Sequence, residues 1–114
     1  MIGRGAAAEA VALQFLQKKG LKLVAQNYRC RFGEIDLVMR DEATLVFTEV
    51  RLRTSRDFGG AAASVTTQKQ RKIILAAKHY LSELKQMPAC RFDVALLDDI
   101  NIDRVEWIKN AFSE

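Results

Sequence analysis

The 114-residue sequence has one histidine, one proline, two cysteines and no long apolar run. A single histidine with two distant cysteines, Cys30 and Cys90, cannot supply a Cys/His zinc cage. The longest uninterrupted apolar run has five residues, Ile73–Ala77, which is too short to cross a bilayer. Because Glu9 interrupts the apolar run at 6–8, we expect no secretory signal, a reducing cytoplasmic location and two buried free thiols.

The overall composition is that of a globular protein, with 49% hydrophobic and 28% charged residues. A chain of this length makes one domain, which we expect to span residues 1–114. Such a domain buries roughly two-thirds of the surface of its unfolded chain, so it needs neither a disulfide nor a metal ion to fold.

Positive charge is concentrated in the middle of the chain. The net charge is +4, but residues 51–78 alone hold seven bases against one acid, Asp57. Residues 79–114, by contrast, hold four bases and seven acids. A basic block of this kind favours a polyanion such as nucleic acid, although it also describes a solvated face without a partner. The seven bases are Arg51, Arg53, Arg56, Lys69, Arg71, Lys72 and Lys78.

The first half of the chain predicts one helix followed by strands. Residues 6–19 have helical apolar spacing and are followed by Gly20, a typical residue after a helix end. The segment 23–28 favours a strand. Residues 34–39 and 44–51 are rich in β-formers and are separated by a short polar turn, which predicts a hairpin.

The second half predicts a helical crossover and two more strands. We expect a flexible loop over 54–65, then a helix over 67–86 whose lysines Lys69, Lys72 and Lys78 face outward. Strands are predicted at 91–97 and 104–108. Since a crossover of about 20 residues suits a parallel connection, the order predicts an α/β fold with a central mixed β-sheet flanked by helices.

Two acidic residues interrupt strands that otherwise have the pattern of sheet interior. Asp36 lies between the apolar residues Ile35 and Leu37. Glu49 lies between the β-branched residues Thr48 and Val50. A buried unpaired carboxylate is costly, so each needs a cation, hydrogen-bond donors or water. Alternation places Glu34 with Asp36, and Glu49 with Arg51, on shared faces. If Asp36 or Glu34 opposes Glu49 across the hairpin, all of these groups converge, whereas a one-residue shift separates them.

Two chemical interpretations of this cluster stay open. Two or three carboxylates beside a cation match the needs of a hard divalent ion, which keeps several waters and bridges to phosphate. Such a site activates water for phosphodiester hydrolysis. The alternative is a salt bridge between the acids and Arg51 or Arg53, with no metal.

Several motifs resemble those of one bacterial family. They are GEIDLV at 33–38, LVFTEVR at 45–51, FG at 58–59, VTTQKQRK at 65–72 and RFDV at 91–94. In this order and spacing they resemble the YraN-type family of uncharacterised bacterial proteins. That family in turn is similar to Holliday-junction resolvases of the restriction-endonuclease-like superfamily. The resemblance implies a restriction-endonuclease-like fold with a D…(D/E)xK metal site.

The resemblance also implies roles for individual residues. Asp36 and Glu49 occupy the two acidic positions of the site, and Glu9 matches a further acidic position. Glu34 is implied as an accessory ligand, and Arg51 stands where the superfamily has lysine. Magnesium or manganese is the implied cofactor, held by these four carboxylates, with Asp36, Glu49 and Arg51 as catalytic residues.

The sequence departs from the superfamily pattern at two places. Arg51 can hold a phosphate oxygen, but arginine does not give up its proton as a lysine can. Lys69 matches a family position and is therefore a further catalytic candidate that would supply an ammonium group to the site. At Ala63, the sequence lacks an acidic residue that the family usually has.

Three functions are consistent with these features. The first is a metal-dependent nuclease that acts on branched or single-stranded DNA and forms a homodimer, as a resolvase-like enzyme would. The second is a nucleic-acid-binding module with little or no catalysis, and the third is a domain that binds an acidic protein partner through its basic helix. The residues expected to contact nucleic acid are Arg51, Arg53, Arg56, Phe58, Lys69, Arg71 and Lys72.

Overall fold

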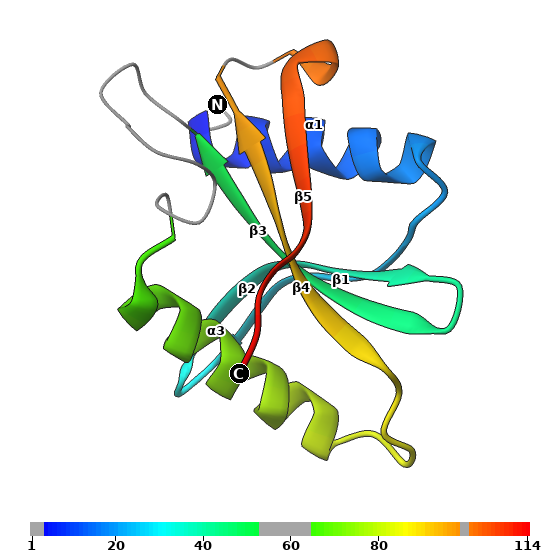
Figure 1. Ribbon diagram of the computed structural model, residues 1–114, viewed down its shortest axis with the longest axis vertical. Helices are drawn as coiled ribbons and strands as arrows, with labels where there is room; N and C mark the ends of the chain where they lie inside the picture. The colour runs from blue at the N-terminus through cyan, green and yellow to red at the C-terminus, as the bar shows by residue number, and fades with distance from the viewer. Residues whose placement is uncertain (1–3, 53–64, 99–100) are drawn as a thin grey trace.

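The computed structural model describes residues 4–52, 65–98 and 101–114, which form an α/β fold (Figure 1). The chain begins with a helix, continues through three strands, crosses over by a second helix and ends with two further strands. The elements are α1 (Arg4–Lys18), β1 (Lys22–Cys30), β2 (Gly33–Asp41), β3 (Thr44–Leu52), α3 (Thr67–Ser82), β4 (Cys90–Leu97), a 3₁₀ turn η1 (Ile102–Arg104) and β5 (Val105–Phe112).

The five strands of the described residues form one mixed sheet in the order β1-β2-β3-β4-β5. All neighbouring strands are antiparallel except β3 and β4, which run parallel. The parallel pair is joined through α3, because strands in this orientation need a long crossover. The predicted mixed sheet with a helical crossover is therefore confirmed, and it is compatible with a restriction-endonuclease-like fold.

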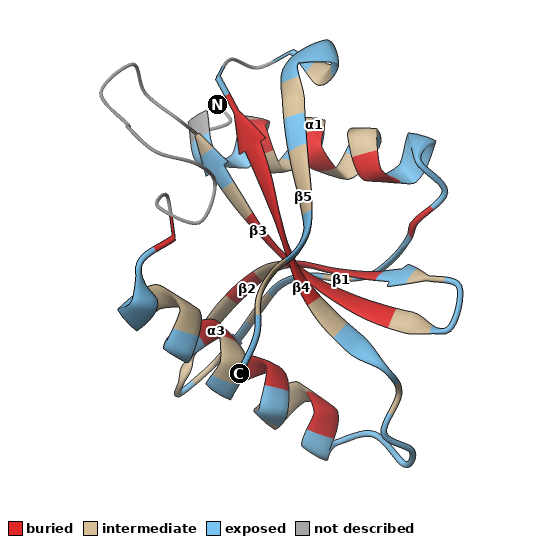
Figure 2. Cartoon of the chain, in the orientation of Figure 1, coloured by how far each residue is buried: buried red, intermediate tan, exposed pale blue. Residues whose placement is uncertain are grey.

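The two helices cover opposite faces of the sheet (Figure 1). Ala8, Ala12 and Leu16 of α1 pack on one face, and Ile73 and Ala77 of α3 pack on the other. The central strands are buried on both sides, as the red segments of β3 and β4 show in Figure 2. This double burial explains why β4 has a nearly continuous apolar sequence.

Several predicted boundaries were wrong. Helix α3 ends at Ser82 rather than at residue 86, and Leu84 beyond its end is exposed. Strand β5 begins after the 3₁₀ turn and continues to Phe112, because the Phe112 ring stacks on Phe92 with centroids 5.1 Å apart. The predicted loop at 54–65 lies outside the described residues except for Val65, which is buried.

The two cysteines are free thiols, as expected, but they are not both buried. Cys30 is half-buried and Cys90 is exposed at the start of β4. Burial therefore does not explain why these thiols occur in the sequence.

No helix in the described part of the chain has the length and apolarity needed to cross a membrane.

One fully buried carboxylate holds the C-terminal strand in place. Asp93 of β4 accepts hydrogen bonds from Trp107 Nε1 at 2.9 Å and from the backbone N–H of Asn110 at 2.9 Å. The guanidinium of Arg91 donates to the same carboxylate at 3.1 Å. These donors compensate the cost of burying the charge, since a buried carboxylate is tolerated when it is paired and hydrogen-bonded.

Replacing Asp93 with alanine should destabilise the protein strongly. The substitution leaves the indole of Trp107 and the backbone of Asn110 without an acceptor, so we expect the free energy of unfolding to fall by about 3 kcal/mol. Urea denaturation measures this change. The control is Asp103→Ala at an exposed position, for which we expect a change within about 0.5 kcal/mol. Equal effects of the two substitutions would contradict this role of Asp93.

Candidate functional site

The sheet opens between β2 and β3, and the candidate site lies at this opening. Pairing of β2 with β3 ends at Leu37 opposite Thr48, although β3 continues beside β4 as far as Leu52. Beyond that point the beginning of β2 and the end of β3 run apart (Figure 1). The next pair in the same register would be Asp36 opposite Glu49. Both carboxylates therefore stand where the two strands separate.

The alternation of side chains along β2 breaks at Asp36. Ile35 packs in the core beneath α3, whereas Leu37 packs in the core beneath α1, although strict alternation would place both on one face. On the neighbouring strand, Asn27 has a positive φ of 51°. Asp36 itself is anchored because its Oδ2 accepts a hydrogen bond from the backbone N–H of Val50 at 2.8 Å. The side chain thus ties β2 to β3 where ladder pairing has stopped.

Glu49 is the buried partner of Asp36. Its side chain is only 5% exposed, and its carboxyl group is in hydrogen-bond contact with that of Asp36. Burial, and then the neighbouring Asp36, raise the pKa of Glu49 from 4.5 to about 8. The expectation that positions 36 and 49 converge is confirmed.

Glu9 approaches the same region from α1. Burial first, followed by the charges of Asp36 and Glu34, raises the pKa of Glu9 above its ordinary value. Arg29 and a hydrogen bond with Asn27 act in the opposite direction. The Oε1 atom of Glu9 is buried and has no hydrogen-bond partner among the described residues. An unsatisfied buried oxygen is rare in native proteins and needs an explanation.

Two cationic side chains border the carboxylate pair. The Nζ of Lys69 lies 3.9 Å from Oε2 of Glu49, and Arg51 is close enough to oppose the rise in the pKa of Glu49. Lys72 and Lys78 are exposed as predicted, and Lys69 is partly exposed, with its side chain 42% exposed, while its ammonium lies beside Glu49. The expectation that the Lys69 ammonium reaches this site is confirmed.

Other predicted site residues are not brought to the pair. Glu34 forms an ion pair with Arg29, with an Oε2–Nε distance of 3.1 Å, although its charge still acts on Glu9. Arg71 lies along a different groove, which α3 forms with Ser113 and Glu114. Arg53, Arg56, Phe58 and Ala63 lie outside the described residues.

The donors present fit a hard divalent cation. Within the ranges described above, no three His, Cys, Asp or Glu side chains form a preformed metal cage. Magnesium, however, is usually bound by only one or two carboxylates, with waters and phosphate oxygens completing its shell. Asp36 and Glu49 supply two carboxylates in contact, and the carboxyl group of Glu9 is close enough for the charge of Asp36 to raise its pKa. A cation would relieve both the like-charge repulsion and the unsatisfied oxygen.

Among the described cations, a salt bridge alone is a weaker explanation of the cluster, and Arg53, the other cation of that alternative, lies outside the described residues. Lys69 approaches Glu49 only to 3.9 Å, and Arg51 is exposed. Neither cation compensates the burial of Glu49, since its pKa remains at about 8.

Comparison with known proteins gives a consistent result. Residues 8–97 match the model of a family described as uncharacterised protein family UPF0102. A UPF0102 protein of Cupriavidus taiwanensis is 57% identical over 110 residues, which cover 96% of this chain and 82% of the relative. A UPF0102 protein of Nitrosospira multiformis is 56% identical over 109 residues, which cover 96% and 92%. The relative from Psychromonas ingrahamii is 55% identical, with 97% and 90% covered. The resemblance stated from the motifs is confirmed.

Glu49→Gln should change how stability depends on pH. Folded protein keeps the Glu49 proton up to about pH 8, whereas the unfolded chain releases it near pH 4.5. Wild type therefore loses stability as pH rises through this window, and the glutamine variant does not. We expect the Tm of wild type to fall by several degrees relative to the variant between about pH 5 and about pH 8.

Glu42→Gln, an exposed change in the hairpin turn, is the control, and its Tm should run parallel to that of wild type. Parallel curves for wild type and Glu49→Gln, measured by thermal melts in chelator, would show that Glu49 ionises normally.

Proposed function

We propose that this chain, which belongs to the uncharacterised protein family UPF0102, binds nucleic acid and hydrolyses phosphodiester bonds with the help of a divalent cation. The observation that supports this proposal most directly is the contact between Asp36 and Glu49 at the opening of the sheet, with the Lys69 ammonium 3.9 Å away. Groups whose pKa is strongly raised by burial and a like charge are characteristic of functional sites. The substrate we propose is DNA, in branched or single-stranded form.

Asp36 and Glu49 would hold the cation, which we propose to be magnesium or manganese, with Glu9 beside them. When bound, the cation supplies an activated water and neutralises charge at phosphorus. Asp36 is already oriented by the Val50 N–H. Glu49 keeps a proton near neutral pH in the absence of a cation and must release it to become a ligand.

Lys69 is proposed to take the role that the superfamily gives to the lysine replaced by Arg51. Its ammonium lies beside Glu49 although it comes from α3 rather than from β3. Lysine can both stabilise a phosphate oxygen and exchange a proton, whereas arginine can only do the former. Arg51, which is exposed on the same strand as Glu49, would contact the phosphate backbone.

A nucleic-acid-binding module with little catalysis is the second candidate. The replacement of lysine by Arg51 favours it, because the group in the usual position cannot act as a base. The two candidates share the same binding surface and differ only in turnover. Homodimer formation stays a prediction in both.

Substitutions at the carboxylate pair should abolish cleavage. We expect wild type to cut branched or single-stranded DNA with magnesium or manganese, and Asp36→Ala or Glu49→Ala to lower the rate by about 10²-fold or more. Lys69→Arg tests the proton-exchange role, and it should reduce the rate far more than it reduces binding. A gel assay on duplex, single-stranded and four-way substrates measures these rates.

Asp103→Ala is the acidic control for that assay, and it should cut at the wild-type rate. Cleavage that survives Asp36→Ala would indicate a contaminating nuclease. Salt-sensitive binding without cleavage under any metal would favour the second candidate.

Cation binding should be detectable without any substrate. At about pH 7.5, millimolar Mn²⁺ should raise the Tm of wild type by a few degrees, because a ligand that binds only the folded state stabilises it. The shift should shrink near pH 5, because the metal then has to displace the Glu49 proton at a much higher proton concentration than at about pH 7.5. Asp36→Asn and Glu49→Gln should both lose the shift, while Asp103→Asn should keep it. An equal shift in all four proteins would place manganese elsewhere.

A further inference from the structure

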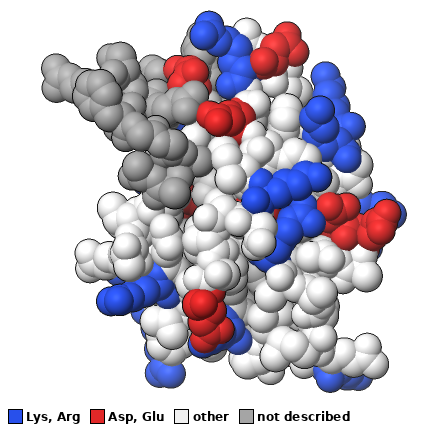
Figure 3. All heavy atoms as spheres, in the orientation of Figure 1, with Lys and Arg blue, Asp and Glu red and all other residues white. Residues whose placement is uncertain are grey.

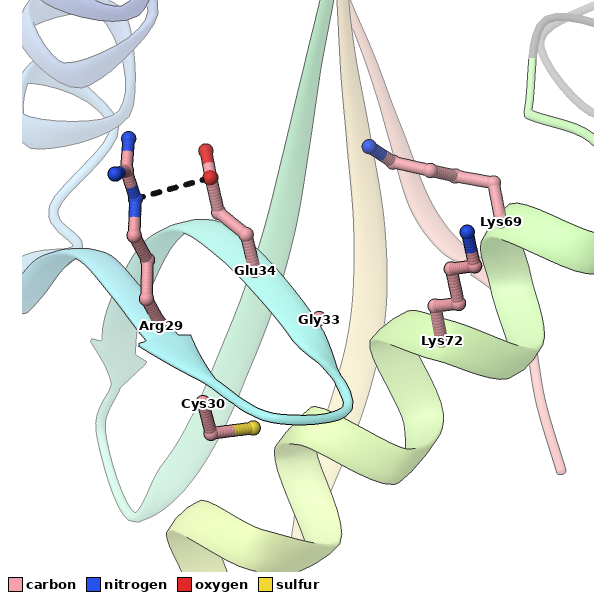
Figure 4. Close-up of a pocket in the computed structure, with 6 residues that line it drawn as sticks. All are labelled: Arg29, Cys30, Gly33, Glu34, Lys69 and Lys72. Carbon is pink, nitrogen blue, oxygen red and sulfur yellow. Dashed lines mark ion pairs between the residues drawn. The ribbon is translucent and has the colours of Figure 1, made fainter.

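A second polar feature lies next to the carboxylate pair. An open pocket of about 340 Å³ lies between the β1–β2 turn and the first half of α3 (Figure 4). Figure 4 shows Lys69 and Lys72 extending from α3, and Arg29 and Glu34 from the hairpin on the opposite side. The lining residues are Arg29, Cys30, Gly33, Glu34, Lys69 and Lys72.

The pocket is positively charged. Three of its lining residues are cations and one is an anion, and the anion Glu34 is paired with Arg29 at 3.1 Å. The three cations and one anion give the lining a net charge of +2, and the exposed Arg29 can contact a ligand as well as Glu34. On the face shown in Figure 3, Lys and Arg side chains lie in several groups, some of them beside Asp or Glu. A pocket with an excess of positive charge concentrates anionic ligands.

The position of the pocket is set by close contact between the hairpin and α3. Gly33 lies so near the helix that a Cβ at this position would be 3.3 Å from both Cβ and O of Lys72. Aromatic contacts hold the same hairpin on the helix, since the rings of Tyr28 and Tyr80 lie 5.2 Å apart and those of Phe32 and His79 lie 5.9 Å apart. The pocket is thus formed by packed elements rather than by surface side chains alone.

Lys69 connects this pocket to the candidate cation site. It lines the pocket and also lies 3.9 Å from Glu49. An anion in the pocket would therefore lie beside the carboxylate pair. Neighbouring phosphates of one polynucleotide strand provide this arrangement, with one phosphate at the cation and another among the lysines.

We propose that the pocket between the β1–β2 turn and α3 binds a phosphate group of the nucleic acid, either an internal phosphodiester or a terminal phosphate. This inference rests on the proposed function and assigns Arg29 and Lys72 to it as phosphate-binding residues. Arg29 lies outside the basic block of the middle of the chain, so charge counting along the sequence did not identify it. The pocket fixes which phosphate stands next to the cation site.

The test measures binding of the full-length protein to labelled 12-nucleotide single strands by fluorescence anisotropy in EDTA. One strand has a 5′-phosphate and the other a 5′-hydroxyl. Arg29→Gln/Lys72→Gln removes two pocket cations. Lys18→Gln/Arg104→Gln removes one lysine and one arginine from exposed positions on α1 and η1, which makes it a matched control for net charge. Circular dichroism melts verify that both variants fold.

At about 0.1 M salt, one phosphate contact on a single strand contributes about fivefold in affinity, so two contacts contribute roughly 20-fold. We expect the pocket variant to bind roughly 20-fold more weakly with a shallower salt dependence, and the control to change by less than about twofold. A wild-type preference for the 5′-phosphate that the pocket variant loses assigns a terminal phosphate. Equal loss on both strands assigns an internal one.

If the pocket variant and the control lose affinity for the strands to the same extent, the proposed phosphate site is wrong. Binding that depends on the pocket without cleavage under any metal would leave the pocket standing and remove the hydrolytic function. If wild type binds neither strand, both proposals fail.

Discussion

Two carboxyl groups meet where β2 leaves β3, and the rest of the site is arranged around this contact. Asp36 is held by the backbone N–H of Val50, and Glu49 is buried against it. Burial and the neighbouring Asp36 both oppose ionisation of Glu49, so the arrangement costs stability at neutral pH. The cost is tolerated because the packed sheet and its two helices keep the strands in place. In the proposed function, a bound cation offsets this cost.

A comparison of the two buried carboxylates clarifies the argument. Asp93 is fully buried but accepts hydrogen bonds from Trp107, Arg91 and the backbone of Asn110. Its donors belong to the protein itself, so its role is to hold β5 on the sheet. Glu49 has a second acid, Asp36, as its neighbour, and the Lys69 ammonium lies 3.9 Å from its Oε2 atom. The same residue chemistry therefore serves structure in one strand and points to ligand binding in the other.

Much of the fold followed from local patterns. The hairpin of β2 and β3, the helical crossover and the parallel strand were all predicted, because apolar periodicity and β-propensity report burial directly. The site was predicted in part, since Asp36 and Glu49 are conspicuous among apolar neighbours. The ends of α3 and β5, the exposure of Cys90 and the pairing of Glu34 with Arg29 were missed. Each of these depends on contacts between residues far apart in the chain, which periodicity does not record.

The sequence by itself determined which residues form strands and helices and which acids lie in the sheet interior, because both depend on each residue and its near neighbours. Only the tertiary structure decided how these acids are combined. Asp36 contacts Glu49 because β2 and β3 separate at this point and the side-chain alternation of β2 breaks there. The packing of α3 on the sheet brings Lys69 from a different element to the same place. Register and helix docking are properties of the whole packed chain, so no local pattern contains them.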